Sequence, residues 1–272
     1  MENRKIVLTV TDGIAFITLN RPDAMNAVDI DAAEQFAEAV AEVEAEPHVR
    51  CVVLRGAGRH FTAGGDVKLF HATLAMSEEE RASVFERILG FMNPAITGLR
   101  SMPKPVLTSV QGVAAGLGVS LIGASDLAIA ADDAVFTLAF GRIGGTPDSG
   151  ASFALPRMLG AKRASQLVFL GDRFDARQAL DWGLVNWVVP SADLARQTDD
   201  LAARLAAGPT GAFGRAKALL QRSLETDLAS QLEAERESFV RSSNTREFRE
   251  GLSSLLEKRE PDFRRVSSGA KP

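Results

Sequence analysis

Short apolar strands alternate with helical segments along the first half of the chain, and no other feature restricts the fold as much. Strands rich in β-branched residues are expected at 6–10, 14–19, 49–54, 106–110, 127–130 and 135–138. Apolar residues at helical spacing over 30–46 predict a helix, and the small, apolar segment 116–125 predicts a buried one. Strands that are mostly separated by helices favour crossover units of an α/β fold.

Local signals mark where individual elements begin and end. The dipeptide Asp12-Gly13 stands between the first two expected strands and is typical of a tight hairpin turn. Ser77 and Glu80 have capping-box spacing, which predicts a helix from there toward residue 100, with a kink or a break at Pro94. After residue 148 we expect a strand at 184–189 and helices at 191–207, 210–225 and 228–257.

The composition argues against several classes of protein. Hydrophobic residues make up 46% of the 272 residues, and the net charge of −4 comes without the basic patch that nucleic-acid binding requires. The chain shows neither the pattern of a signal peptide nor an apolar run of the roughly 18 residues that a membrane span requires. Cys51 is the one cysteine, so no intrachain disulfide can form. We therefore expect a cytoplasmic globular protein.

Two glycine clusters follow expected strands and are the strongest candidates for a binding site. They are FTAGGDVK at 61–68 and QGVAAGLGVS at 111–120. Glycines at such turns let main-chain N–H groups point into a cleft, and two turns that face each other would make an oxyanion hole. The second cluster does not match a dinucleotide-binding fingerprint, because Leu121 stands in the place of the third glycine. Close helix packing through small residues is the alternative that the glycines alone leave open.

At these clusters the sequence resembles the crotonase superfamily, the enoyl-CoA hydratase/isomerase family. The similarity begins at LNRP (19–22) and MNA (25–27), passes through both glycine clusters, and ends at EGLSSLLEKREPDF (250–263). The resemblance implies a spiral of repeated ββα units over residues 1–200 and a helical trimerisation region over 201–272. It also implies a coenzyme A thioester substrate, no metal or redox cofactor, and a homotrimer or a dimer of trimers.

The resemblance also assigns residues to each part of the site. It places the oxyanion-hole donors at the main-chain N–H groups of Gly65 and Leu117. The acyl pocket is expected to contain Ala115, Gly116, Ser120, Phe140 and Pro147. The residues expected to bind coenzyme A are Ala24, Met25, Ala63, Gly64, Asp66, Val67 and Lys68, with Phe239 and Lys258 reaching the coenzyme A of a neighbouring subunit. Ordinary packing on a helix face is the alternative for Phe239, and Asp66 is also expected to accept N–H bonds within its own loop.

The expected reaction depends on which acidic residues occupy the family's active-site positions. Hydratases of the family use two glutamates, and Ser120 and Phe140 stand at those positions here. Asp148, in GGTPDSG (144–150), is the acid that remains, and this part of the chain looks most like the branch near the epoxyphenylacetyl-CoA isomerases. One carboxylate suffices to move a proton from C2 to C4 beside a thioester, so we expect an isomerase. A hydratase that recruits another residue and a non-catalytic coenzyme A binder are the alternatives.

Two further features of Asp148 bear on this role. Apolar neighbours such as Phe140 and Phe153 would raise the pKa of its carboxyl group by disfavouring the charged form. Its place before Ser149 also suits the N-cap of a helix that starts there, and a capping side chain would point away from a substrate. Histidines flank the first glycine cluster at positions 60 and 71, but no second histidine–carboxylate group accompanies them, so no metal site is indicated.

Overall fold

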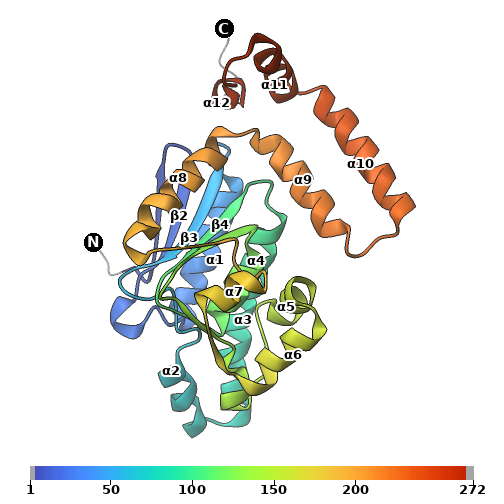
Figure 1. The fold of residues 1–272 in the computed structure, drawn as a ribbon. Coiled ribbons are helices and arrows are strands. Elements are labelled where there is room, and N and C mark those ends of the chain that lie inside the picture. Colours follow the sequence, from blue (N-terminus) through green and yellow to red (C-terminus); the bar gives the residue numbers. More distant parts are fainter. Residues whose placement is uncertain (1–3, 268–272) are drawn as a thin grey trace.

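The structure, a computed structural model, describes residues 4–267, and two sheets form its centre (Figure 1). The larger sheet has the strand order β1-β2-β3-β4-β6-β9, with β1 Ile6–Thr11, β2 Ile14–Leu19, β3 Cys51–Gly56, β4 Val106–Val110, β6 Leu127–Ala131 and β9 Trp187–Val189. The smaller sheet has the order β5-β7-β8, with β5 Val113–Ala115, β7 Val135–Thr137 and β8 Arg173–Asp175. Strands β1 and β2 pair antiparallel, whereas β2, β3, β4, β6 and β9 run parallel.

The hairpin expected at Asp12-Gly13 joins β1 to β2. Thr11 pairs with Ile14, and both turn residues have positive φ, 52° at Asp12 and 77° at Gly13. Positive φ at both central residues defines the tight turn whose twist matches that of the flanking strands, and Asp-Gly adopts it readily. The expectation for this turn is confirmed.

The chain passes repeatedly from the large sheet to the small one. It runs from β4 to β5 and then into α4 (Leu117–Ala124), and it runs again from β6 to β7. After β3, an isolated bridge pairs Thr62 with Ala114 of β5, so the first glycine cluster joins the small sheet as well. These three passages are the repeated strand–strand–helix units that the sequence led us to expect, and they bring both glycine clusters side by side.

The large sheet is buried on both faces, which explains the continuous apolar runs of its strands. Val52 and Leu54 of β3 belong to the main core cluster, whereas Cys51 and Val53 belong to a second one. Successive side chains of a strand point to opposite faces of its sheet. The main cluster contains residues of α1 (Ile30–Ala45), α3 (Glu78–Ser101) and α4, and the second contains residues of α8 (Leu194–Ala207) (Figure 1).

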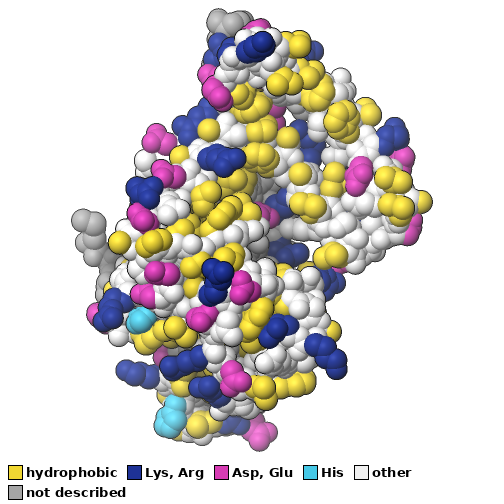
Figure 2. All heavy atoms as spheres, viewed as in Figure 1, with side chains coloured by type: hydrophobic (Ala, Val, Ile, Leu, Met, Phe, Trp, Pro, Cys, Tyr) yellow, Lys and Arg dark blue, Asp and Glu magenta, His cyan; other side chains and the backbone are white. Residues whose placement is uncertain are grey.

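The remaining helices fall into two groups. One group packs around the two sheets and completes the body of the protein, and the C-terminal helices form an arm. Those of the body are α2 (Val67–Ala72), α5 (Ala151–Leu159), α6 (Ala161–Leu170) and α7 (Ala176–Asp181). The arm extends away from the body and consists of α9 (Thr210–Arg222), α10 (Leu228–Ser243), α11 (Arg246–Glu257) and α12 (Phe263–Ser267) (Figure 1). Apolar side chains gather along it in Figure 2, and the exposed ones include Leu220, Leu228, Phe239, Leu255 and Leu256. The expected division at residues 200 and 201 falls inside α8, which packs on the sheet, so the arm begins with α9.

Several local expectations need correction. The single helix expected at 228–257 is two helices, because the Thr245 side chain accepts the N–H of Phe248 and caps a new helix, α11. Pro94 does not split α3, whose buried residues Met92 and Ile96 lie on both sides of it in the core. The short strand β8 lies in a segment where only helices were expected, and among the described helices none is long and apolar enough to cross a membrane.

Candidate active site

A cavity of about 110 Å³ lies where the two glycine clusters meet α3 and the segment before α5. The first cluster contributes Ala63, Gly64 and Gly65, and the second contributes Gly116 and Leu117. The remaining lining residues are Val28, Val67, Phe70, Ile88, Leu89, Met92, Ala139, Phe140, Ile143, Asp148 and Ser149. The walls are therefore apolar apart from main-chain groups and two neighbouring polar side chains, as is common in ligand-binding sites.

Main-chain hydrogen bonds hold the two glycine clusters against each other. The N–H of Thr62 donates to the Val113 carbonyl at 3.0 Å, and the N–H of Ala115 donates back to the Thr62 carbonyl at 2.9 Å. A side chain at Gly64 would place its Cβ 2.8 Å from the Ala115 carbonyl oxygen, and one at Gly65 would place it 2.4 Å from the Phe70 ring. Gly64, which also has a positive φ of 90°, is required because the two loops approach so closely there, whereas a side chain at Gly65 would have to displace the Phe70 ring of α2.

The N–H groups of Gly65 and Leu117 are free to bind a ligand. Neither has a hydrogen-bond acceptor among residues 4–267. Leu117 is the first residue of α4, where the N–H groups of a helix have no partner within the helix and carry a partial positive charge. Both residues line the same cavity, which an oxyanion hole built from their N–H groups requires.

Asp148 is the one ionisable side chain among the described residues that line this cavity. It is half-buried, and burial raises the pKa of its carboxyl group above the ordinary value, while a hydrogen bond with the Ser149 side chain lowers the pKa to a smaller extent. A raised pKa makes a carboxylate a stronger base. The direction agrees with the sequence-based hypothesis. Of the two phenylalanines named there, Phe140 lines the cavity with Asp148, whereas Phe153 does not, and the centre of the Phe153 ring lies 3.6 Å from the Arg157 guanidinium group.

The alternative role of Asp148 as a helix cap is not realised. Helix α5 begins at Ala151 rather than at Ser149, and its N-cap residue, Gly150, makes no side-chain capping bond. Asp148 contributes its main-chain carbonyl instead, which accepts the N–H of Ala151 at 3.0 Å. Its carboxyl group therefore remains available to the cavity.

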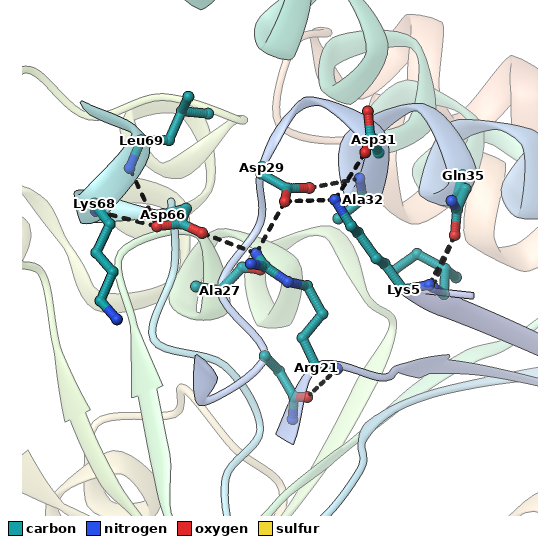
Figure 3. Close-up of polar contacts among 12 residues, drawn as sticks. Lys5, Arg21, Ala27, Asp29, Asp31, Ala32, Gln35, Asp66, Lys68 and Leu69 are labelled. Atoms are coloured by element: carbon teal, nitrogen blue, oxygen red, sulfur yellow. Dashed lines mark hydrogen bonds and ion pairs between the residues drawn. The ribbon is translucent and has the colours of Figure 1, made fainter. Parts of the chain in front are cut away.

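The two segments expected to hold coenzyme A lie beside the cavity and are tied together by Arg21 (Figure 3). The Arg21 guanidinium group donates to Asp66 at 2.9 Å and to the Ala27 carbonyl at 2.6 Å. The Met25 carbonyl accepts the N–H of Ala63 at 2.8 Å. Asp66 also accepts the N–H groups of Lys68 and Leu69 at the start of α2, which confirms that it stabilises its own loop.

A family model described as enoyl-CoA hydratase/isomerase matches residues 9–266. The chain belongs to the enoyl-CoA hydratase/isomerase family. It is 37% identical to a 1,2-epoxyphenylacetyl-CoA isomerase of Escherichia coli over 95% of this chain and 97% of that protein. It is 34% identical to a probable enoyl-CoA hydratase of Rhodobacter capsulatus, with 97% of this chain and 99% of that protein covered.

Solved structures confirm the family's fold. A putative enoyl-CoA hydratase/isomerase from Mycobacterium abscessus superposes with a TM-score of 0.90 at 34% identity, covering 95% of this chain and 98% of that one. The crotonase fold expected from the sequence is therefore shown, and the chain is an enzyme of a family that acts on acyl-CoA substrates.

The structure brings together part of the site that resemblance to the family implied. Of the expected residues, those that line the cavity are Ala63, Gly64, Gly65, Val67, Gly116, Leu117, Phe140 and Asp148. Ala24 and Met25 lie in and after a short helical turn, Asp66 and Lys68 lie at the start of α2, and Ala115, Ser120 and Pro147 do not line the cavity. Phe239 and Lys258 belong to the arm, at α10 and after α11, and their expected contact with a neighbouring subunit stays a prediction.

Sequence reasoning missed several residues of this enoyl-CoA hydratase/isomerase site. Ile88 and Met92 are four residues apart on α3, and although part of this helix was expected to border the pocket, these two residues were not singled out. Ser149 stands beside Asp148, is 5% exposed and has a positive φ of 48°. Strained backbone of this kind gathers at functional sites. No group of three or more His, Cys, Asp or Glu side chains in the described part of the chain is placed to hold a metal ion.

Proposed function

We propose that this protein is an enoyl-CoA isomerase that shifts a double bond, or rearranges an epoxide, beside a coenzyme A thioester. The observation that carries the proposal is the pairing of one carboxyl group, that of Asp148, with the two free N–H groups of Gly65 and Leu117 around one cavity. An isomerase of this kind requires one group that moves a proton and a site that stabilises an enolate oxygen. In this proposal Asp148 is the proton-moving group, and the two N–H groups form the oxygen-binding site.

The reaction follows from these groups. Asp148 removes a proton from C2 of a 3-enoyl thioester, and the electron pair moves onto the thioester carbonyl oxygen. The N–H groups of Gly65 and Leu117 stabilise the enolate oxygen, and each such donor contributes about 2.7–4 kcal/mol in other enzymes. The Asp148 carboxyl group then returns the proton at C4, which leaves the double bond between C2 and C3. These steps transfer only a proton, so they call for no metal or redox cofactor.

The surroundings of Asp148 support an apolar acyl group at the reacting carbons. Phe140, Ile88 and Met92 border the same cavity as the carboxyl group. These side chains exclude water from the enolate, which strengthens its hydrogen bonds and discourages addition of water to the product.

An enoyl-CoA hydratase is the second candidate, and the name of the Rhodobacter capsulatus relative favours it. Hydration requires a positioned water and two proton transfers. Ser120 and Phe140 stand at the positions that the family's hydratases fill with glutamates, and neither side chain exchanges protons near neutral pH. The carboxyl group of Asp148 would have to perform both transfers. A non-catalytic coenzyme A binder, the third candidate, would give no reason for a lone half-buried carboxyl group beside free N–H groups.

Two absorbance assays with the purified protein separate these candidates. We expect conversion of a 3-enoyl-CoA to its 2-enoyl isomer and little loss of crotonyl-CoA absorbance. Hydration of crotonyl-CoA at a rate above that of isomerisation would establish the hydratase instead. Coenzyme A binding without turnover of either thioester would establish the non-catalytic binder.

We further propose that the arm assembles the enzyme into a homotrimer or a dimer of trimers. Leu255 and Leu256 are 74% and 84% exposed, and Leu220, Leu228 and Phe239 are exposed on the same arm. A run of exposed apolar side chains of this extent is typical of a surface that another protein covers. A neighbouring arm in such an assembly would bring Phe239 and Lys258 near a second coenzyme A site.

A further inference from the structure

Ser120 of α4 makes a hydrogen bond that reaches the segment carrying Asp148. Its Oγ donates to the main-chain carbonyl oxygen of Asp148 at 3.1 Å. The side chain is 1% exposed and does not line the cavity, so the hydroxyl faces this carbonyl rather than a substrate. Ser120 thus differs from the pocket residue that its sequence position led us to expect.

This bond connects the two halves of the proposed catalytic machinery. Leu117 begins α4, and Ser120 follows three residues later, so one rigid helical turn carries both the oxyanion donor and the serine. The other hydrogen bonds that residues 144–149 make within the described chain stay local, as between Gly145 and Phe140 and between Asp148 and Ala151. Ser120 therefore supplies the hydrogen bond from this segment to the helix of the oxyanion hole.

The segment that Ser120 holds would otherwise be free to change its backbone conformation. Gly144 and Gly150 have positive φ angles of 68° and 85°, and Ser149 has one of 48°. Glycines leave a chain many alternative conformations, and a non-glycine residue in the left-handed region is held there by its surroundings. A displacement of about 1 Å in a reacting group can reduce a rate roughly 10²-fold.

We propose that Ser120 is a positioning residue, which fixes the Asp148 carboxyl group relative to the Leu117 N–H group through its bond to the Asp148 carbonyl. The inference rests on the proposed isomerase function. In this inference the Ser120 hydroxyl has a positioning role at a site where the family's hydratases carry a catalytic glutamate. When the serine hydroxyl is removed, the Asp148 carbonyl still accepts the N–H of Ala151. The variant therefore leaves no buried carbonyl without a donor, and its effect should come from the altered position of the Asp148 carboxyl group.

The test compares Ser120→Ala with Ser125→Ala, which removes a hydroxyl from the other end of the same helix. Ser125 is the C-cap residue of α4, and its Oγ hydrogen-bonds the Leu121 carbonyl at 2.9 Å and the Thr108 hydroxyl, both away from Asp148. For Ser120→Ala we expect kcat for 3-enoyl-CoA isomerisation to fall about 10- to 100-fold with KM changed less than about twofold. Ser120→Cys, which keeps a donor at this position but a weaker one, should lie between wild type and Ser120→Ala. Ser125→Ala should keep the wild-type kcat.

A second measurement does not depend on turnover. NMR titration of ¹³C-labelled aspartate, with Asp148 assigned by its absence in Asp148→Asn, reports the pKa of this carboxyl group in each variant. Release of the segment should expose the carboxyl group and lower its pKa in Ser120→Ala but not in Ser125→Ala. A wild-type kcat with a wild-type titration in Ser120→Ala would overturn the inference, as would an equal loss of kcat in Ser125→Ala. Should the wild type isomerise no thioester, the proposed function fails, and the titration still decides whether Ser120 holds Asp148.

Discussion

The ammonium group of Lys217 lies 2.8 Å from the Asp126 carboxylate and joins the arm to the body of the protein. Lys217 is 8% exposed and also donates to the Leu99 carbonyl at 2.7 Å. Burial lowers the pKa of Lys217 and raises the pKa of Asp126, so desolvation outweighs the attraction between the two charges. The ion pair is therefore expected to add little net free energy to folding, and its main effect is to set the position of α9 against the body.

Removal of one member of this pair should be costly. Lys217→Met removes the buried partner of Asp126 and of the Leu99 and Lys104 carbonyls, and we expect a loss of about 3–5 kcal/mol in the free energy of unfolding. Denaturant unfolding of the variant measures it, with Lys162→Met at an exposed position as the control. The double variant Asp126→Asn with Lys217→Met should lose less than the sum of the two single changes. Strict additivity would show that the two groups do not interact.

A proline at position 117 tests the oxyanion hole because it removes the main-chain N–H of this residue. Leu117 is the first residue of α4, a position that tolerates proline because its N–H has no partner within the helix. If this N–H stabilises the enolate, Leu117→Pro should lose about 10²–10³-fold in kcat, whereas Leu117→Ala, which keeps the N–H, should lose much less. Steady-state kinetics and melting temperatures of both variants make the comparison. Equal kcat values in two equally stable variants would remove Leu117 from the oxyanion hole.

The pKa of Asp148 determines how activity and stability depend on pH. The carboxylate form is the base, so the rate should rise with pH through a midpoint above the ordinary value of about 3.9 and then level off. Because the pKa in the folded protein is raised, this group's contribution to stability is present below the ordinary pKa and is lost as pH rises through the raised one. Asp148→Asn should therefore melt at a higher temperature than the wild type at neutral pH. A pH–rate profile that is already flat at pH 4.5 would contradict the raised pKa.

The exposed leucines of the arm should hold the oligomer together. Leu256→Glu buries a charge in any interface that covers this residue, so we expect the variant to sediment as a smaller species than the wild type. Leu74→Glu changes a leucine of the body that is 65% exposed, and it should keep the wild-type mass. Sedimentation velocity over a range of concentrations distinguishes them. A monomeric wild type would refute the proposed trimer.

The sequence predicted those parts of the candidate site that a short local motif encodes. The glycine clusters after strands indicated where main-chain N–H groups could enter a cleft, and the family resemblance then assigned Gly65, Leu117 and Asp148 to the site. The direction of the Ser120 hydroxyl and the face of α3 that carries Ile88 and Met92 depend on packing between distant segments, which no local pattern encodes. The break before α11 carried a local signal, since Thr245 is a good N-cap residue, but the apolar periodicity on both sides concealed it.

The central claim is that one carboxyl group moves the proton, and exchange of the C2 protons of an acyl-CoA tests it most directly. In D₂O, the wild type should exchange these protons for deuterium, as NMR of the thioester reports. Asp148→Asn, with the same shape but no base, should exchange them about 10²–10⁴-fold more slowly while still binding the thioester. Exchange at the wild-type rate in Asp148→Asn would show that another group removes the proton, and the proposed mechanism would be wrong.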